Sequence, residues 1–238
     1  MDKHITDDEF IINGISSHIK NDTNVKEKLV ISEEKPEDSI QASLKKMDTW
    51  GFLMDIQFAK VTVEKNKIYY QGDICTSGID TLIEKTREVY HEMKKHAHEL
   101  GVPIENITIE LYITSNGGAI SEGFRYIDYA NSLKVKFKTI VFGYAASMGF
   151  VMWLLGKERQ ITKNSHILIH QLSAGFGGKR ADIIDYMKHL DDVQNQLVSF
   201  ISENSGMSIK KTEELMAKET WLTSAEAINM GLGSLWEG

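Results

Sequence analysis

The stretch "GYAASMGFVMWLL", residues 143–155, decides the fold because it can be read in two incompatible ways. It lies in an uncharged run of eighteen residues from Thr139 to Gly156, which is about the minimum length of a membrane-spanning helix. The run also contains three glycines, and its first residues continue a strand pattern that begins at Lys134. A strand, a turn and a buried helix from Ser147 explain the same letters. We therefore expect no membrane span.

The composition is that of a globular protein with a large core. Hydrophobic residues make up 42% of the 238 residues and charged residues 26%, both ordinary values. The net charge is −7 and no long basic stretch occurs, which argues against nucleic acid and anionic membranes as partners. The single Cys75 cannot form an internal disulfide, and no export signal is visible at the N-terminus. We expect a cytoplasmic protein in which Cys75 is a small buried residue.

Residues 1–50 differ from the rest of the chain. Eleven Asp or Glu and seven Lys make 18 of these 50 residues charged, and Phe10 and Trp50 are the only aromatic ones. Such a segment buries little apolar surface, so we predict a mobile extension over 1–50 and one domain over 51–238. A flexible tail, a docking arm and a removable pro-segment all fit the extension.

Strand and helix patterns alternate beyond residue 52. Runs rich in β-branched and aromatic residues predict strands at 67–74, 107–115, 134–142 and 166–171. Helical spacing of apolar residues predicts helices at 79–100, 119–133, 179–204, 208–218 and 224–230. Strands separated by helices favour an α/β fold with a largely parallel sheet.

Ser147 lies where the predicted turn meets the predicted buried helix, and this position has two interpretations. A serine at a helix start is most often an N-cap that accepts a backbone hydrogen bond. Alternatively, the unpaired N–H groups of the first helical turn can stabilise an oxyanion that develops beside a serine nucleophile.

Three motifs occur in one order: "TSNGG" (114–118), "GYAASMG" (143–149) and "NSHILIHQ" (164–171), the last followed by "GFGG". In this combination the sequence resembles the proteolytic subunits of the Clp protease family, which are serine peptidases, from about Lys67 to the C-terminus. The resemblance implies a ClpP/crotonase-like α/β fold of repeated β-β-α units with a helical ring-contact segment. It also implies hydrolysis of unfolded polypeptides or peptides.

The resemblance assigns a catalytic triad. Ser147 is the nucleophile, and His170 is the base that takes its proton and returns it to the departing amine. His166 competes as base, but four residues along a strand separate the two imidazoles by about 13 Å, so only one can reach Ser147. The family match favours His170. In "KETWLTSAEA", Glu219 stands where relatives usually have an aspartate, and it is either the orienting acid or a solvated helix-end carboxylate.

The resemblance also assigns the groups that bind substrate. The N–H groups of Gly118 and Met148 are the expected oxyanion-hole donors. An extended substrate chain is expected to pair with main-chain edges. These edges comprise Ile120, Leu172, Ser173 and Gly175. No metal or cofactor is expected, because one cysteine and scattered histidines lack ligand spacing.

Relatives stack two seven-membered rings through the helical segment that follows the histidine. Residues 175–197 fit that role, although an ordinary helix packed on its own domain would look the same. The side chains able to face a neighbour are Ile183, Ile184, Met187 and Leu190. By resemblance we expect a homo-oligomer, as a heptameric ring or double ring. AAA+ unfoldases bind relatives through an ordered N-terminal loop and apolar pockets at the ring edge. Residues 1–50 do not resemble that loop, which argues against such a partner without excluding one.

The leading hypothesis is therefore a Ser-His-Glu endopeptidase. A catalytically silent ring or regulatory subunit is the main alternative. An acyl-CoA enzyme of the crotonase group would share the fold, but the combination of Ser147 and His170 favours hydrolysis. A Ser-Lys dyad is disfavoured because neither Lys157 nor Lys163 lies in a matching motif.

Overall fold

The computed structural model describes residues 59–175 and 177–238, which belong to a compact unit spanning Ile56–Gly238. The predicted extension over 1–50 lies outside the described residues. Within the described part, no helix combines the length and the apolar composition that a bilayer crossing requires.

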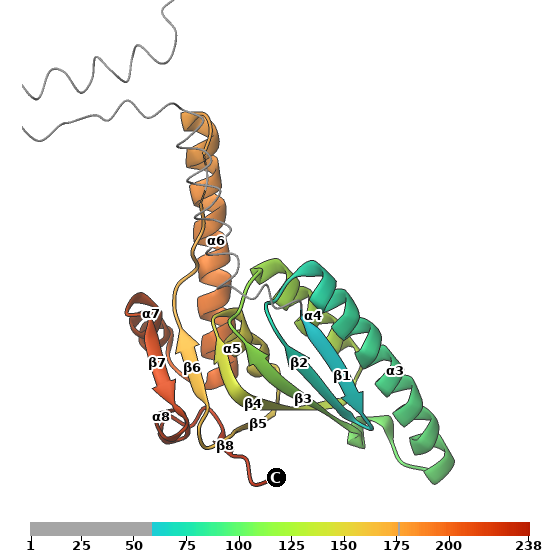
Figure 1. The fold of residues 1–238 in the computed structure, drawn as a ribbon. Coiled ribbons are helices and arrows are strands. Elements are labelled where there is room, and N and C mark those ends of the chain that lie inside the picture. Colours follow the sequence, from blue (N-terminus) through green and yellow to red (C-terminus); the bar gives the residue numbers. More distant parts are fainter. Residues whose placement is uncertain (1–58, 176) are drawn as a thin grey trace, which may run out of the picture. The chain divides into compact units, whose positions relative to one another are not determined.

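The described residues form an α/β fold, as predicted (Figure 1). Its strands are β1 (Lys60–Glu64), β2 (Lys67–Gln71), β3 (Thr108–Ser115), β4 (Lys136–Ala146), β5 (Glu158–Ile161), β6 (His166–Ile169), β7 (Thr220–Thr223) and β8 (Ser234–Leu235). Its α-helices are α3 (Thr76–Leu100), α4 (Ile120–Ser132), α5 (Met148–Trp153), α6 (Arg180–Ser205), α7 (Ile209–Ala217) and α8 (Ser224–Asn229). A short 3₁₀ turn, η1 (Ile104–Asn106), precedes β3.

The sheet is parallel at its centre and divides along β4. β2, β3 and β4 run parallel, and β1 pairs antiparallel with β2 at one edge. The first half of β4 pairs with β5, ending at Val141, whereas its last residues, from Tyr144, pair with β6. Gly143 lies between the two pairings with φ +100°, a conformation that favours glycine. The strand can therefore leave one neighbour and join another.

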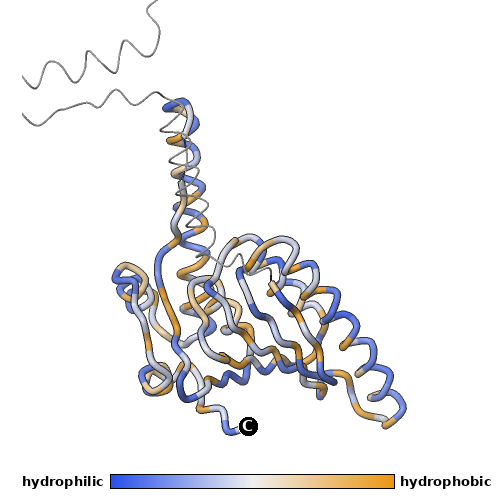
Figure 2. The backbone as a smooth tube through the Cα atoms, in the orientation of Figure 1, coloured by the Kyte–Doolittle hydropathy of each residue, from blue (hydrophilic) through white to orange (hydrophobic). Residues whose placement is uncertain are grey.

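The helices bury apolar stripes against this sheet. α3 buries Ile79, Leu82 and Val89 and is polar on its outer side, so apolar and polar residues alternate around it (Figure 2). The six residues of α5 are all buried. The uncharged run is therefore the end of β4 followed by a short core helix, which confirms the interpretation chosen from the sequence.

α6 is buried only near its C-terminal end, at Leu197, Val198 and Ile201. Its first half extends beyond the sheet in Figure 1 and exposes large apolar side chains. Met187 is the most exposed of them at 53%, with Ile183 and Ile184 close to 40%. The predicted ring-contact segment thus has uncovered apolar surface, and three of its four predicted side chains supply it.

Four strands were not predicted from the sequence: β1, β5, β7 and β8. They are short, from two to five residues, so each shows too little alternation to stand out. Cys75 also differs from the expectation, because it is half-buried at the start of α3 rather than fully buried.

Candidate active site

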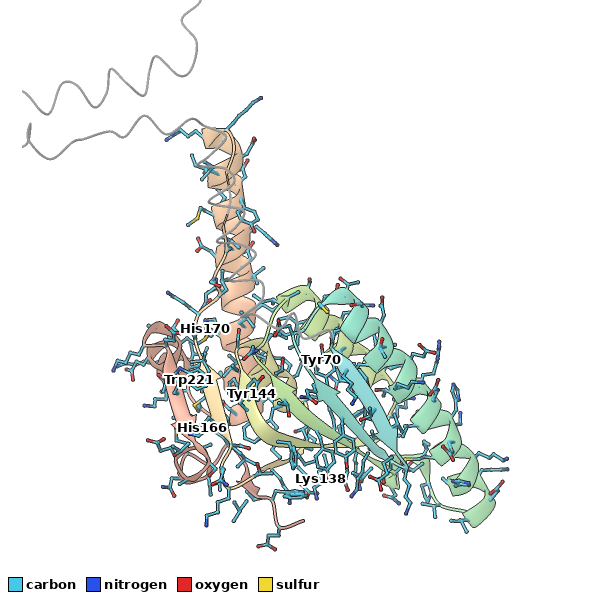
Figure 3. The ribbon with its side chains drawn as sticks, viewed as in Figure 1. Tyr70, Lys138, Tyr144, His166, His170 and Trp221 are labelled. Carbon is cyan, nitrogen blue, oxygen red and sulfur yellow. The ribbon has the colours of Figure 1, made fainter. Side chains whose placement is uncertain are left out.

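Ser147 and His170 follow the ends of two neighbouring parallel strands. β4 and β6 pair in the register Ala146↔Leu168, and the Ser147 N–H donates to the Leu168 carbonyl over 2.9 Å. Because parallel strands end at the same edge of a sheet, the chain leaves β4 at Ser147 and leaves β6 at His170 on the same side. His166 begins β6 and lies at its opposite end (Figure 3).

A cavity of about 580 Å³ opens at this edge. Most of the sequence-predicted site residues line it: Gly118, Ile120, Ser147, Met148, His170, Leu172 and Ser173. Neither His166 nor Glu219 belongs to the lining, and Gly175 is an exposed residue beyond it. The structure therefore brings the proposed nucleophile, base and oxyanion donors to one cavity and leaves the proposed acid outside.

The Ser147 backbone is held in an unusual conformation. Its φ of 55° and ψ of −124° are rare for a residue with a side chain and cost on the order of 1–3 kcal/mol. Ser147 occupies the N-cap position of α5, but its hydroxyl accepts no capping hydrogen bond. The N-cap interpretation therefore does not account for the serine.

The loop Gly117–Gly118 packs directly against Ser147. A Cβ on Gly117 would lie 2.5 Å from the Ser147 Cβ and 2.8 Å from the Ala146 oxygen, so only glycine fits. Ile74 holds the other side of the loop, since its N–H donates to Gly117 and its carbonyl accepts from Ala119. We call this pair of hydrogen bonds the strap, and the Gly118 N–H between them has no acceptor among the described residues.

Two residues that line the cavity with Ser147 have backbone N–H groups without an acceptor in the described structure. Among the residues that the structure describes, neither the Gly118 N–H nor the Met148 N–H donates a hydrogen bond to protein. Met148 is the first residue of α5, where backbone donors have no partner within the helix. Both groups are thus available to an anionic oxygen bound beside Ser147.

His170 and Glu219 are neighbours by strand register. β6 and β7 pair antiparallel as far as Ile169↔Thr220. His170 comes directly after this pair, where β6 ends, and Glu219 comes directly before it, where β7 begins. The imidazole is half-buried and the carboxylate is exposed. Among the described residues, no hydrogen bond joins His170 to Ser147 or to Glu219.

The wall contributed by α6 was not predicted from the sequence. Gln194 accepts a hydrogen bond from the Leu172 N–H over 3.0 Å, which removes that donor from the predicted substrate-binding edge. Tyr186, His189 and Leu190 also line the cavity. Leu190 therefore differs from the expectation that it faces a neighbouring subunit. No local sequence signal marks Gln194 as the acceptor for Leu172, because the contact joins residues that lie 22 positions apart.

The deeper lining of the cavity is apolar. It consists of aromatic and aliphatic side chains from α4, α5 and α6, namely Phe124, Phe150, Val151, Leu197 and Ile201. A lining of this kind binds an apolar side chain, while the polar groups around Ser147 orient it. In the described part of the chain, no group of three or more His, Cys, Asp or Glu side chains is arranged to hold a metal ion.

Comparison with known proteins places the sequence among one family of relatives. The sequence profile of the Clp protease family, described as "Clp protease", matches residues 78–234. The chain is 34% identical over 127 residues to the ATP-dependent Clp protease proteolytic subunit of Streptococcus pneumoniae strain Hungary19A-6, and equally to that of strain CGSP14. The alignment covers 52% of this chain and 65% of the relatives' length.

A match over more than half of the chain identifies the family. The protein belongs to the Clp protease family, as a divergent member, and its α/β fold is consistent with that family.

Proposed function

We propose that the protein is a serine endopeptidase that cleaves unfolded polypeptides or peptides. The observation that carries the proposal is the parallel pairing of β4 with β6, which delivers Ser147 and His170 to one cavity. Membership of the Clp protease family supports the same reaction.

In the proposed reaction, the Ser147 hydroxyl attacks a peptide carbonyl while His170 accepts its proton. The carbonyl oxygen becomes an oxyanion, which the Gly118 and Met148 N–H groups stabilise. His170 then donates the proton to the departing amine as the C–N bond breaks. Water, deprotonated by His170, hydrolyses the resulting acyl-serine and restores the free hydroxyl.

His170 makes no hydrogen bond to Ser147 among the described residues, so the proposed proton transfer requires the two side chains to come into hydrogen-bond contact. Loose contact between nucleophile and base is common without substrate. Glu219 is the proposed orienting acid, since it stands across from His170, one position beyond the last pair of β6 and β7. In the proposed active arrangement, its exposed carboxylate accepts a hydrogen bond from the imidazole.

The proposed substrate is an extended chain that presents an apolar side chain to the cavity. Ile120, Ser173 and Gly175 remain as its proposed main-chain partners. Leu172 would contribute through its carbonyl and side chain, because Gln194 accepts its N–H. Recognition through the main chain makes cleavage depend weakly on substrate sequence.

A fluorophosphonate probe tests the proposal, because it reacts only with an activated serine. We expect wild-type protein to be labelled on Ser147 and both Ser147→Ala and His170→Ala to lose labelling by at least about 10³-fold. His166→Ala is the matched control and should label like wild type. Equal labelling of wild type and Ser147→Ala would refute the enzyme.

A catalytically silent ring or regulatory subunit is the second candidate. The lack of a hydrogen bond between His170 and Ser147 in the described structure favours it. This candidate predicts no labelling together with stable assembly. The same probe experiment therefore separates the two functions.

We also propose that the chain forms a homo-oligomer, as a heptameric ring or double ring, through the first half of α6. The exposed apolar side chains Ile183, Ile184 and Met187 support this contact. Met187→Asp should shift the protein to smaller assemblies in sedimentation velocity. The adjacent Lys188→Asp, which changes an exposed polar residue, should not.

An ATPase partner is a further expectation from the relatives, whose name describes an ATP-dependent protease. A pocket of about 190 Å³, lined by aromatic side chains such as Tyr69 and Phe142 and by polar ones such as Lys60, is the surface that we propose for such a partner. Residues 1–50 do not resemble the N-terminal loop through which relatives bind unfoldases. Cleavage of a folded substrate only in the presence of an added unfoldase would support this partner.

A further inference from the structure

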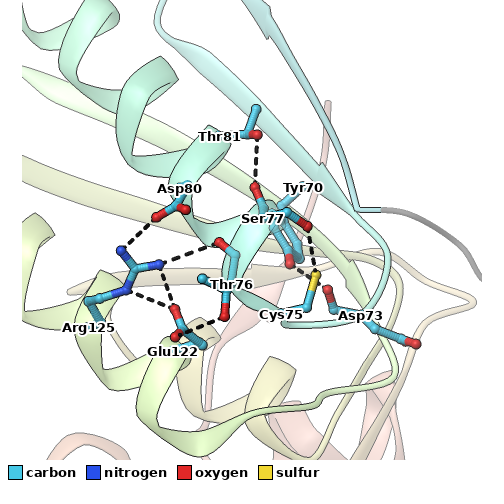
Figure 4. Close-up of polar contacts among 9 residues, drawn as sticks. All are labelled: Tyr70, Asp73, Cys75, Thr76, Ser77, Asp80, Thr81, Glu122 and Arg125. Atoms are coloured by element: carbon cyan, nitrogen blue, oxygen red, sulfur yellow. Dashed lines mark hydrogen bonds and ion pairs between the residues drawn. The ribbon is translucent and has the colours of Figure 1, made fainter.

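An ion-pair cluster lies next to the proposed oxyanion loop. The Arg125 guanidinium of α4 donates to Asp80 Oδ1 over 2.8 Å and to Glu122 Oε2 over 2.8 Å from Nε. A third contact runs from Arg125 to the Thr76 carbonyl over 3.5 Å, and the Thr76 hydroxyl donates to Glu122 over 3.3 Å. Figure 4 shows the guanidinium between these groups.

The cluster joins the N-terminal ends of two helices, within their first two turns. Thr76 and Asp80 belong to α3, whereas Glu122 and Arg125 belong to α4. A positive charge is unfavourable near helix N-termini, and the two carboxylates around the guanidinium offset this repulsion. Its hydrogen bonds to Asp80 and Glu122 raise the pKa of Arg125 above its ordinary value. The two helix starts are thus tied by a multidentate contact rather than by one surface pair.

These helix starts adjoin the backbone that carries the unpaired donors. Thr76 follows the strap residue Ile74 by two positions, and α4 begins two residues after Gly118. The strap binds the loop on both sides, and a Cβ on Gly118 would lie 2.3 Å from the Ile74 oxygen. A shift of α4 relative to α3 must therefore be absorbed in this loop.

The same helix turn also contacts the second donor. A Cβ on Gly123 would lie 2.4 Å from Met148 Cε, so the Met148 side chain packs tightly on α4 between Glu122 and Arg125. The start of α4 is therefore fixed to Gly118 through the chain and to Met148 through packing.

We infer that Arg125 is a positioning residue that clamps α4 to α3 and thereby sets the separation of the Gly118 and Met148 N–H groups. The inference rests on the proposed function, because the two donors matter only if an oxyanion forms. Arg125 is not among the residues that line the cavity, so its proposed role is to position other groups. Its effect acts on the transition state, where donor placement within a fraction of an ångström counts.

The test measures hydrolysis of a short fluorogenic peptide with an apolar residue before the cleaved bond. Arg125→Ala should lower kcat by about tenfold with KM within about twofold, because the donors serve the transition state. Arg125→Lys should recover part of kcat, since lysine keeps the positive charge but lacks the several fixed N–H donors of the guanidinium. Arg87→Ala is the matched control, because Arg87 is an exposed arginine on α3 without an ion pair in the described part.

Amide hydrogen exchange gives a second readout that does not need activity. In Arg125→Ala, the Ala119 and Ile74 amides, which form the strap, should exchange faster than in Arg87→Ala. If Arg125→Ala fails to fold, Arg125→Lys carries the test, and a lowered kcat at an unchanged unfolding midpoint supports the clamp.

The outcomes distinguish the two ideas. A wild-type kcat in Arg125→Ala, with Ser147→Ala inactive, would overturn the positioning role and leave the peptidase intact. A wild type without Ser147-dependent hydrolysis would refute the proposed function, and the positioning role would fall with it. Unchanged exchange at both amides would overturn the clamp whatever the activity.

Discussion

Gly117→Ala is the substitution that most directly tests how the glycine loop meets the serine turn. Gly117 has φ +99°, and a left-handed conformation costs a residue with a Cβ about 1–2 kcal/mol. The added Cβ would lie 2.5 Å from the Ser147 Cβ and 2.8 Å from the Ala146 oxygen. Because one of these neighbours is backbone, relief requires a shift that costs about 1–3 kcal/mol more. The free energy of unfolding should therefore fall by about 2–5 kcal/mol.

Gly206→Ala separates the two contributions. Gly206 has φ +77°, but its added Cβ would meet nothing within 4 Å, so only the conformational cost of about 1–2 kcal/mol applies. Urea unfolding of both variants isolates the crowding contribution by difference. Labelling by the fluorophosphonate probe should fall by about 10²-fold or more in Gly117→Ala, because the loop carries an oxyanion donor, and stay normal in Gly206→Ala. Equal stability and equal labelling of the two variants would refute the close approach of Gly117 to Ser147.

Three further predictions follow from single contacts. Ser147→Gly should be more stable than Ser147→Ala by about 1 kcal/mol in urea unfolding, because glycine relieves the strained φ and ψ. Gln194→Ala leaves the Leu172 N–H without its acceptor, which should cost about 1–3 kcal/mol of unfolding free energy and raise the KM for peptide about tenfold. Asn195→Ala, at the adjacent position, is the control and should leave the KM unchanged. Hydrogen bonds from the Thr223 backbone and hydroxyl lower the pKa of Glu226, so this stabilisation is present above the unfolded-state pKa of about 4.3 and is lost as the pH falls through the folded pKa. Wild type should therefore lose more of its urea midpoint on acidification than Glu226→Gln.

Long periodic patterns in the sequence were sufficient to predict the main elements of the fold. The strand patterns at 107–115 and 134–142 correspond to β3 and β4, and the helical pattern at 179–204 corresponds to α6. Ser147 and His170 were assigned to one site by the family resemblance, and in the structure each directly follows the end of a strand, β4 and β6. Local spacing therefore predicted the elements, whereas the resemblance assigned the site residues.

The features missed from the sequence depend on contacts between distant residues. β7 has only the four residues "TWLT", and it is a strand because β6 supplies an edge to pair with. Gln194 is one polar residue on a charged helix, and nothing local marks it as the acceptor for Leu172. Glu219 was assigned by its place in "KETWLTSAEA", where relatives usually have an aspartate, but its exposure depends on how α7 meets β7.

The division of the sheet along β4 explains why the site forms at this edge. If β4 paired with β5 along its whole length, the end of β6 would lie one strand further from Ser147, and His170 could not share its cavity. Gly143 allows the change of neighbour, because it lies between the two pairings and adopts a φ of +100°, which favours glycine. An alanine there would meet only the Thr114 side chain at 3.7 Å, so backbone conformation rather than crowding selects the glycine. The geometry of the proposed site is therefore set by one backbone position outside the cavity lining.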